Sequence, residues 1–191
     1  EVREYRISAP KLWWRDGFWW VCDAGSVMNT PTWDVRSEEG FMAFYRATLG
    51  EVYRYAAMLC GSDRGAAEDI VQDVYLTALT KARGGTLDEL SVGYLMVATR
   101  HRHLDRLRSE QRAQRRLELV ASAPPVDPPT RQLPPQLAEL PERDRVALVL
   151  RYVDDLPVAQ VGRELGISTH AAESLLARAA RRLRQQEARD A

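Results

Sequence analysis

The sequence has few of the residues that would bring covalent cross-links, metal clusters or membrane insertion. Its only cysteines, Cys22 and Cys60, are far apart and neither belongs to a CxxC pair. Neither a disulfide framework nor a zinc site is therefore supported. No apolar run approaches the roughly 18–20 residues that a membrane-spanning helix needs. We expect a cytoplasmic protein with no bound metal and no direct membrane insertion.

Net charge is also lacking, because 27 basic residues balance 27 acidic ones. The overall charge therefore says nothing about binding to nucleic acid. Lysine occurs only at Lys11 and Lys81, so the other basic residues are arginines, which is typical of a GC-rich genome. An apolar fraction of 45% over 191 residues predicts a globular chain of one or two small domains.

The sequence shows no recognisable set of catalytic residues either. We find no nucleophile, general base or cofactor motif, and expect neither enzymatic activity nor a small-molecule substrate. His101 and His103 are two residues apart, so they do not share a helix face and make a poor metal pair. We expect both to be polar groups near a nucleic-acid surface.

Residues 1–27 differ from the rest because four tryptophans fall within eight positions, 13–20. The stretch is too short and too charged for a membrane span, and it lacks the apolar core of a signal peptide. Met28 would be a natural start for the remainder of the chain. We expect an upstream or added segment without a role; the alternative is an aromatic arm that docks on this protein or on a partner.

The stretch from Leu156 to Gln185 predicts two helices joined by a tight turn. Gly166 fits the left-handed residue that ends the first helix, and Ser168 is a good N-cap for the second. The apolar stripes of the two helices are Val158, Val161 and Leu165, then Ala172, Leu176, Ala179 and Leu183.

The opposite face of the second helix has small and polar residues first and basic residues later. Its members are His170, Ser174, Ala177, Arg178, Arg181 and Gln185. A helix that enters the major groove places short side chains near base edges and arginines near phosphates. The pattern favours a DNA-binding helix-turn-helix over an ordinary helical hairpin with a solvated basic face.

Residues 38–116 predict a first helical domain. Residues 64–81 form a helix with Ile70 and Val74 inside, and with the acidic and polar residues around Asp69 and Asp73 outside. This outer face could dock on a basic partner helix, or it could be a solvated face with acids near a helix N-terminus. The residues alone favour the solvated face.

A long arginine-rich helix is predicted from about Val92. Tyr94, Leu95, Val97, Ala98, Leu104 and Leu107 are expected on its buried side. Seven arginines stand against two acids, Asp105 and Glu110, so few acids are available for a surface ladder of ion pairs. This concentration of positive charge favours contact with a phosphate backbone.

Six prolines between residues 121 and 135 predict an extended, semi-rigid linker, which we place at 117–135. The second domain, 136–187, comes after it, with Val146, Val149, Leu150 and Val153 as the inner stripe of its first long helix. The sequence therefore predicts an all-α fold of two small helical domains joined by a proline-rich linker.

Residues 38–187 resemble the extracytoplasmic-function subfamily of sigma-70 factors, the dissociable promoter-recognition subunits of bacterial RNA polymerase. The resemblance rests on four matches in order: AAEDIVQDVYLTAL, YLMVATRHRHLDRLR, ELPERDRVALVLRYVDDLPVAQVGRELGIS and ESLLARAARRLR. It implies that residues 38–116 are region 2, which binds core polymerase and the −10 element. It implies that residues 136–187 are region 4, which binds the −35 element.

The resemblance also implies site residues and partners. The surface that docks on the clamp helices of the polymerase largest subunit would be Asp69, Gln72, Asp73 and Leu76. The −10 DNA would be bound by Arg100, His101, Arg102, Asp105, Arg106 and Arg108. The −35 DNA would be bound by Ser168, Thr169, His170, Glu173, Ser174, Arg178, Arg181 and Arg182. An anti-sigma factor is an expected partner, and no cofactor is.

Two positions depart from the common pattern, because Glu173 and Leu175 stand where basic residues are frequent. The −35 sequence therefore cannot be transferred from relatives. The alternative functions are a helix-turn-helix regulator that binds DNA alone, and an adaptor whose basic helices bind acidic partners.

Overall fold

The computed structural model describes residues 34–85, 90–117 and 135–190, and in these ranges every regular element is a helix. The predicted all-α fold is thereby confirmed. The Trp-rich stretch 1–27 and most of the proline-rich linker lie outside the described residues. None of the helices in the described ranges is both long enough and apolar enough to cross a membrane.

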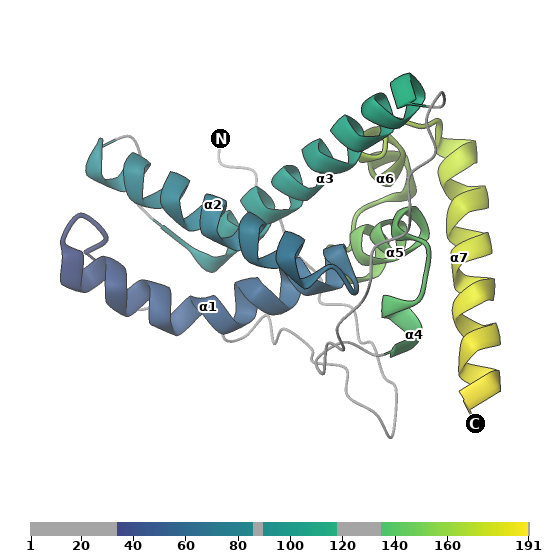
Figure 1. Cartoon of the computed structure of the whole chain (residues 1–191), viewed down its shortest axis with the longest axis horizontal. Helices are drawn as coiled ribbons and strands as arrows, with labels where there is room; N and C mark the ends of the chain where they lie inside the picture. The colour runs from purple at the N-terminus through teal and green to yellow at the C-terminus, as the bar shows by residue number, and fades with distance from the viewer. Residues whose placement is uncertain (1–33, 86–89, 118–134, 191) are drawn as a thin grey trace, which may run out of the picture. The chain divides into compact units, whose positions relative to one another are not determined.

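The first helical group consists of α1 (Glu38–Cys60), α2 (Arg64–Arg83) and α3 (Val92–Leu117). Ser37 caps α1, since its Oγ accepts the Gly40 N–H at 3.1 Å, and Asp63 caps α2 by accepting from the Ala66 N–H at 2.9 Å. The short break between α1 and α2 folds them back on each other as neighbours (Figure 1). Their facing sides, with α3, bury Phe44, Val52, Ile70, Val74 and Leu95.

The second helical group consists of α4 (Pro135–Ala138), α5 (Glu142–Leu148), the π-helical turn η2 (Val149–Val153), α6 (Val158–Glu164) and α7 (Thr169–Asp190). Pro135 was expected to be the last linker residue, but it begins α4. A proline is tolerated there because the first N–H of a helix has no partner to lose.

Val153 was expected on the inner stripe of this group, and that prediction is wrong: its side chain is 41% exposed. The cause is η2, in which the Asp154 N–H bonds the Val149 carbonyl at 3.1 Å across five residues. A π-turn rotates less per residue than an α-helix, so Val153 leaves the row of Val146 and Leu150.

The helix-turn-helix has the predicted local structure. Gly166 takes a φ of 65°, and the Ser168 Oγ accepts the Ala171 N–H at 3.2 Å. Gly162 on α6 is needed for the close turn, because a Cβ there would lie 3.0 Å from the Ile167 carbonyl oxygen.

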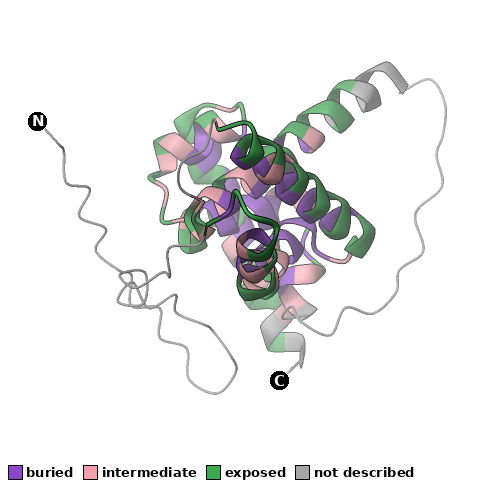
Figure 2. Cartoon of the chain, turned by 90° about the vertical axis from the view of Figure 1, so that its left-hand side faces the viewer, coloured by how far each residue is buried: buried purple, intermediate pink, exposed green. Residues whose placement is uncertain are grey.

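The two helical groups share apolar packing. One buried cluster joins Leu59, Leu104 and Leu107 of the first group to Leu148 and Val149 of the second. Figure 2 shows the buried residues gathered where the helices meet. All the described residues belong to one compact unit.

Candidate nucleic-acid and protein interfaces

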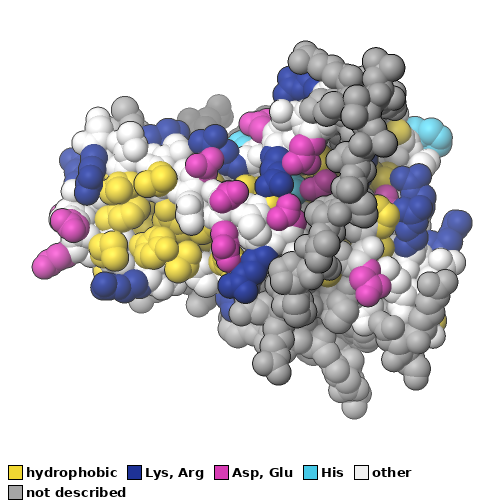
Figure 3. All heavy atoms as spheres, in the orientation of Figure 1, with side chains coloured by type: hydrophobic (Ala, Val, Ile, Leu, Met, Phe, Trp, Pro, Cys, Tyr) yellow, Lys and Arg dark blue, Asp and Glu magenta, His cyan; other side chains and the backbone are white. Residues whose placement is uncertain are grey.

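The acidic face of α2 is solvent-exposed. Asp69, Gln72, Asp73 and Leu76 are all exposed, and their spacing of three and four places them in one row. Leu76 is 62% exposed, although Ile70 and Val74 on the opposite side are buried. Figure 3 shows acidic side chains beside a group of hydrophobic ones on this part of the molecule. Among the large hydrophobic side chains of the described residues, Leu76 is the most exposed, and it lies beside two carboxylates.

The arginines of α3 have more partners than the sequence indicates. Arg106 bonds the carboxylates of Asp63 at 3.1 Å and Glu110 at 2.8 Å. Arg108 bonds the Asp105 carboxylate at 3.0 Å and the Glu164 carbonyl at 2.7 Å. The expectation that few acids are available is wrong, because Asp63, the N-cap of α2, pairs with Arg106, and the Glu164 carboxylate on α6 lies 4.0 Å from Arg108. Both arginines and the carboxylates of Asp63, Asp105 and Glu110 are nevertheless solvent-exposed, and ion pairs between exposed side chains are weak.

The remaining residues of the candidate −10 surface differ in exposure. His101 and Arg102 are exposed, and Arg102 donates to the Thr77 Oγ1 at 3.2 Å. Val97, expected on the buried side of α3, is 42% exposed, so that prediction is wrong. The buried face instead runs through Thr99 and His103, which are one helical turn apart.

Arg100 is the member of this surface that is largely buried. Its side chain is 12% exposed, and its Nη1 lies 3.0 Å from the Oδ2 of Asp154, itself 12% exposed. The Tyr55 hydroxyl donates to both carboxylate oxygens, at 3.0 and 2.9 Å. Burial opposes charge on Arg100, but the hydrogen bond and the negative charge of Asp154 outweigh it and raise the Arg100 pKa.

His103 does not lie near a nucleic-acid surface, so that prediction is wrong. It is 2% exposed, with Nδ1 3.6 Å from the Cys60 Sγ and Nε2 3.6 Å from a carboxylate oxygen of Glu142. Burial, with the positive charges of Arg145 and Arg106, lowers the His103 pKa to about 4. The imidazole is therefore neutral at neutral pH.

The DNA-facing residues expected on the helix-turn-helix are all exposed: Ser168, Thr169, His170, Glu173, Ser174, Arg178, Arg181 and Arg182. Leu175 is different, since it is 4% exposed and belongs to the apolar cluster that joins the two helical groups. Leu175 stands where basic residues are frequent, which suggested a less basic outer face. Because it is buried, it does not affect the charge of that face.

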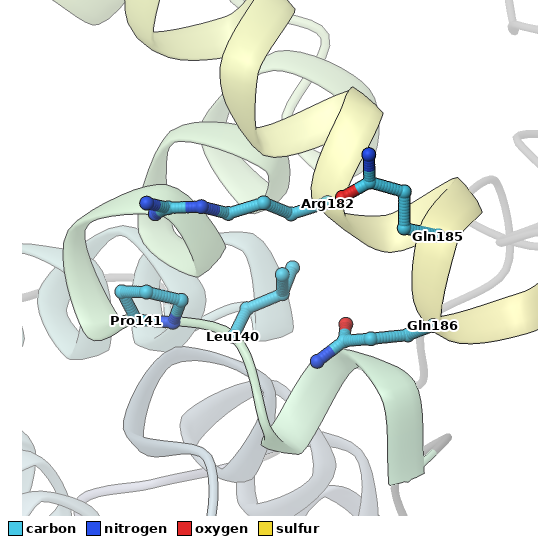
Figure 4. Close-up of a pocket in the computed structure, with 5 residues that line it drawn as sticks. All are labelled: Leu140, Pro141, Arg182, Gln185 and Gln186. Carbon is cyan, nitrogen blue, oxygen red and sulfur yellow. The ribbon is translucent and has the colours of Figure 1, made fainter. Parts of the chain in front are cut away.

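Asp144 contacts two of the arginines expected at the −35 DNA, and the sequence did not reveal this. It is 2% exposed on α5, and its carboxylate accepts from Arg178 at 3.4 Å and also from Arg182. Figure 4 shows Arg182 extending from α7 beside Leu140 and Pro141, where it lines a small pocket. An acid in the first turn of a helix is so common that nothing marked Asp144 as special.

The histidine, cysteine and acidic side chains bear on metal binding and on thiol reactivity. Among residues 34–85, 90–117 and 135–190, no group of three histidine, cysteine or acidic residues could hold a metal ion. Cys60 is buried, and burial raises the pKa of its thiol to about 12, which makes it a poor nucleophile.

Two family descriptions match the chain on the two helical groups. Residues 44–113 match sigma-70 region 2, and residues 131–183 match sigma-70 region 4. An ECF RNA polymerase sigma factor, SigK of Mycolicibacterium vanbaalenii, is 33% identical over 167 residues, which cover 78% of this chain and 83% of that protein. The chain belongs to the ECF sigma factor family.

Two further matches are a relative that covers part of the chain and a solved structure. SigF of Mycobacterium tuberculosis, an RNA polymerase sigma factor, is 44% identical over 54 residues, or 28% of this chain and 21% of that protein. A solved structure of the sigma factor RpoE with the anti-sigma factor NepR, from Bartonella quintana, is 19% identical with a TM-score of 0.48. The match covers 77% of the sigma factor described here and 96% of RpoE.

Proposed function

We propose that this sigma factor binds core RNA polymerase through α2, reads the −10 element with α3 and reads the −35 element with α7. The exposed row on α2 carries the proposal, because Leu76 is 62% exposed beside two carboxylates. An apolar contact surrounded by negative charge fits a basic helical partner, for which we propose the clamp helices of the polymerase largest subunit. A regulator that binds DNA alone does not require such a surface.

The outer face of α7 supports the −35 assignment. His170 and Ser174 are exposed near its N-terminal end, where a recognition helix approaches base edges. Arg181 is exposed and forms no ion pair with another described residue, which leaves it available to a phosphate. We propose that His170 and Ser174 contribute to base preference and that Arg181 contributes to affinity.

Membership of the family also supports proposals about the partners and the location. We propose that the chain acts in the cytoplasm, that an anti-sigma factor sequesters it, and that it performs no catalysis of its own. The domain limits are proposed to be 38–116 for region 2 and 136–187 for region 4, with 117–135 between them.

A charge reversal on α2 tests the polymerase contact. The double variant D69R/D73R should lose binding to core polymerase in a pull-down, because it places two positive charges opposite a basic surface. Its affinity for DNA in the absence of polymerase should survive. The matched control is E38R/E39R, which makes the same charge change at two exposed positions of α1.

Two results would contradict the proposal. Core binding by D69R/D73R at the level of the control would remove α2 as the docking surface. The absence of a promoter-specific transcript in run-off transcription with purified core polymerase would also contradict it, and this is the result expected of an adaptor.

A further inference from the structure

Three polar side chains from both helical groups meet at the contact between α1, α3 and the end of η2. Asp154 follows η2 directly, and its carboxylate accepts from the Tyr55 hydroxyl on α1 and from the Arg100 guanidinium on α3. Arg100 and Asp154 are each 12% exposed. This is the most buried ion pair that joins the two groups among the described residues.

Further contacts join the two helical groups. Arg145 on α5 donates to the Leu59 carbonyl at the end of α1, at 3.2 Å, and is 5% exposed. Arg108 on α3 donates to the Glu164 carbonyl on α6. Together with the shared apolar cluster, these contacts make the interface resemble the interior of a domain more than a transient touch between domains.

The ion pair engages Arg100, a residue that the proposed function assigns to DNA. At 12% exposure the Arg100 guanidinium has little surface left for a nucleic-acid strand, and the Asp154 carboxylate takes one of its outer N–H groups. A carboxylate and a phosphate present similar pairs of anionic oxygens to a guanidinium. The Arg100 side chain therefore cannot contact DNA fully until α3 separates from the end of η2.

We propose that Asp154 is an intramolecular competitor of promoter DNA, which holds Arg100 in a closed form of the free sigma factor. The inference rests on the proposed function, since that function assigns Arg100 to the −10 strand. In the closed form the apparent affinity for DNA is reduced in proportion to the open fraction. Binding to polymerase or DNA must supply the free energy that separates the two groups.

The variant D154N tests the competition because it keeps the size of the side chain and removes its charge. The matched control is D155N, which makes the same charge change one residue later. Asp155 lies at the surface, where it pairs with Arg151 of its own helical group, and its φ of 52° is one that asparagine accepts. The probe is short single-stranded DNA of randomised sequence, labelled with fluorescein and titrated with the full chain.

We expect D154N to bind this DNA roughly tenfold more tightly than the wild type, through a larger open fraction. D155N should bind like the wild type. Small-angle X-ray scattering should show D154N, and not D155N, with a larger radius of gyration. Equal tightening by both variants would mean a general charge effect and would overturn the proposal, as would unchanged affinity of D154N.

Y55F gives a second and milder test that does not depend on D154N folding. It removes the hydroxyl that donates to Asp154 and keeps the buried ring, since Tyr55 is 2% exposed. We expect the same two changes as in D154N, with roughly two- to threefold tighter binding for one lost hydrogen bond. A Y55F chain with wild-type affinity and dimensions would overturn the proposal.

R100A in the D154N background separates failure of the competition from failure of the proposed function. Weaker DNA binding by D154N/R100A than by D154N supports the role of Arg100 at the strand. If the removal of Arg100 leaves the affinity for DNA unchanged while D154N still has a larger radius of gyration, the −10 assignment of Arg100 fails. The role of Asp154 in holding the two helical groups together then still stands. If Arg100 matters but D154N neither expands nor tightens, the competition fails and the −10 assignment stands.

Discussion

Gly61, at the end of α1, offers a sharp test of how the two helical groups are held together. Its backbone has φ 67° and ψ −124°, a combination that residues with a Cβ rarely adopt. A Cβ built there would collide with the guanidinium group of Arg145. The variant G61A must therefore strain the backbone and displace Arg145.

The expected cost follows from these two effects. An alanine in such a backbone conformation costs about 1–3 kcal/mol. Displacing Arg145 breaks its hydrogen bonds to the carbonyls of Leu59, Ala138 and Leu140, at 3.2, 3.3 and 2.9 Å. Leaving a buried charged donor without acceptors costs a further 1–3 kcal/mol, roughly. We expect G61A to lower the free energy of unfolding by about 4 kcal/mol, a large part of the 5–15 kcal/mol of a typical domain.

Urea unfolding followed by circular dichroism measures this change. The matched control is G50A, in the middle of α1, where a Cβ would meet nothing within 4 Å. G50A should stabilise the chain by about 0.5–1 kcal/mol, because alanine is the better helix former. The double variant G61A/R145A should show coupling, since truncating Arg145 removes the collision. A G61A midpoint at or above the wild type, or strictly additive effects of G61A and R145A, would refute the reasoning.

Three further predictions concern buried and paired charges. The His103 pKa of about 4 lies below the unfolded value of 6.5, so the unfolded chain takes up the proton first and stability is lost as the pH falls from 6.5 to 4. The loss should be about 3 kcal/mol, and H103Q should lack it when urea midpoints are compared across this range. R181A should lower the slope of log affinity for −35 DNA against log salt concentration by about one unit. R178A should lower this slope by less, because Asp144 already neutralises Arg178. Equal slopes for R181A and R178A would contradict this. D144N should destabilise the chain by about 1–3 kcal/mol in thermal or urea unfolding, because it leaves the two arginines of α7 without their carboxylate.

Local structure was largely predictable from the sequence. The beginning of α3 at Val92, the left-handed Gly166 and the cap at Ser168 each depend on neighbours within a few residues. Hydrophobic spacing likewise placed Asp69 and Asp73 on the outer side of α2, where they are exposed. These features need no knowledge of distant contacts, which is why helical periodicity and capping rules were enough.

The errors have two causes, which are contacts between distant residues and one irregular helical turn. Arg100 was expected in the open, and its partner Asp154 is 54 positions away, beyond the reach of any helical pattern. His103 follows the periodicity of Thr99 and is buried with it, although a histidine among arginines suggested a polar surface. Val153 was misplaced by η2, because a single π-turn in a helix has no clear sequence signal.

The apolar cluster that joins Leu59, Leu104 and Leu107 to Leu148 and Val149 limits how freely the two halves can be exchanged. A chimera that takes one helical group from a relative must match the side-chain volumes of this cluster. A mismatch would leave a void or cause a steric clash. Truncation to a single half would present the same leucines to water and favour aggregation. An exchange of helical groups that aims to change promoter specificity therefore has to transfer the residues of this cluster together with the helix that reads the DNA.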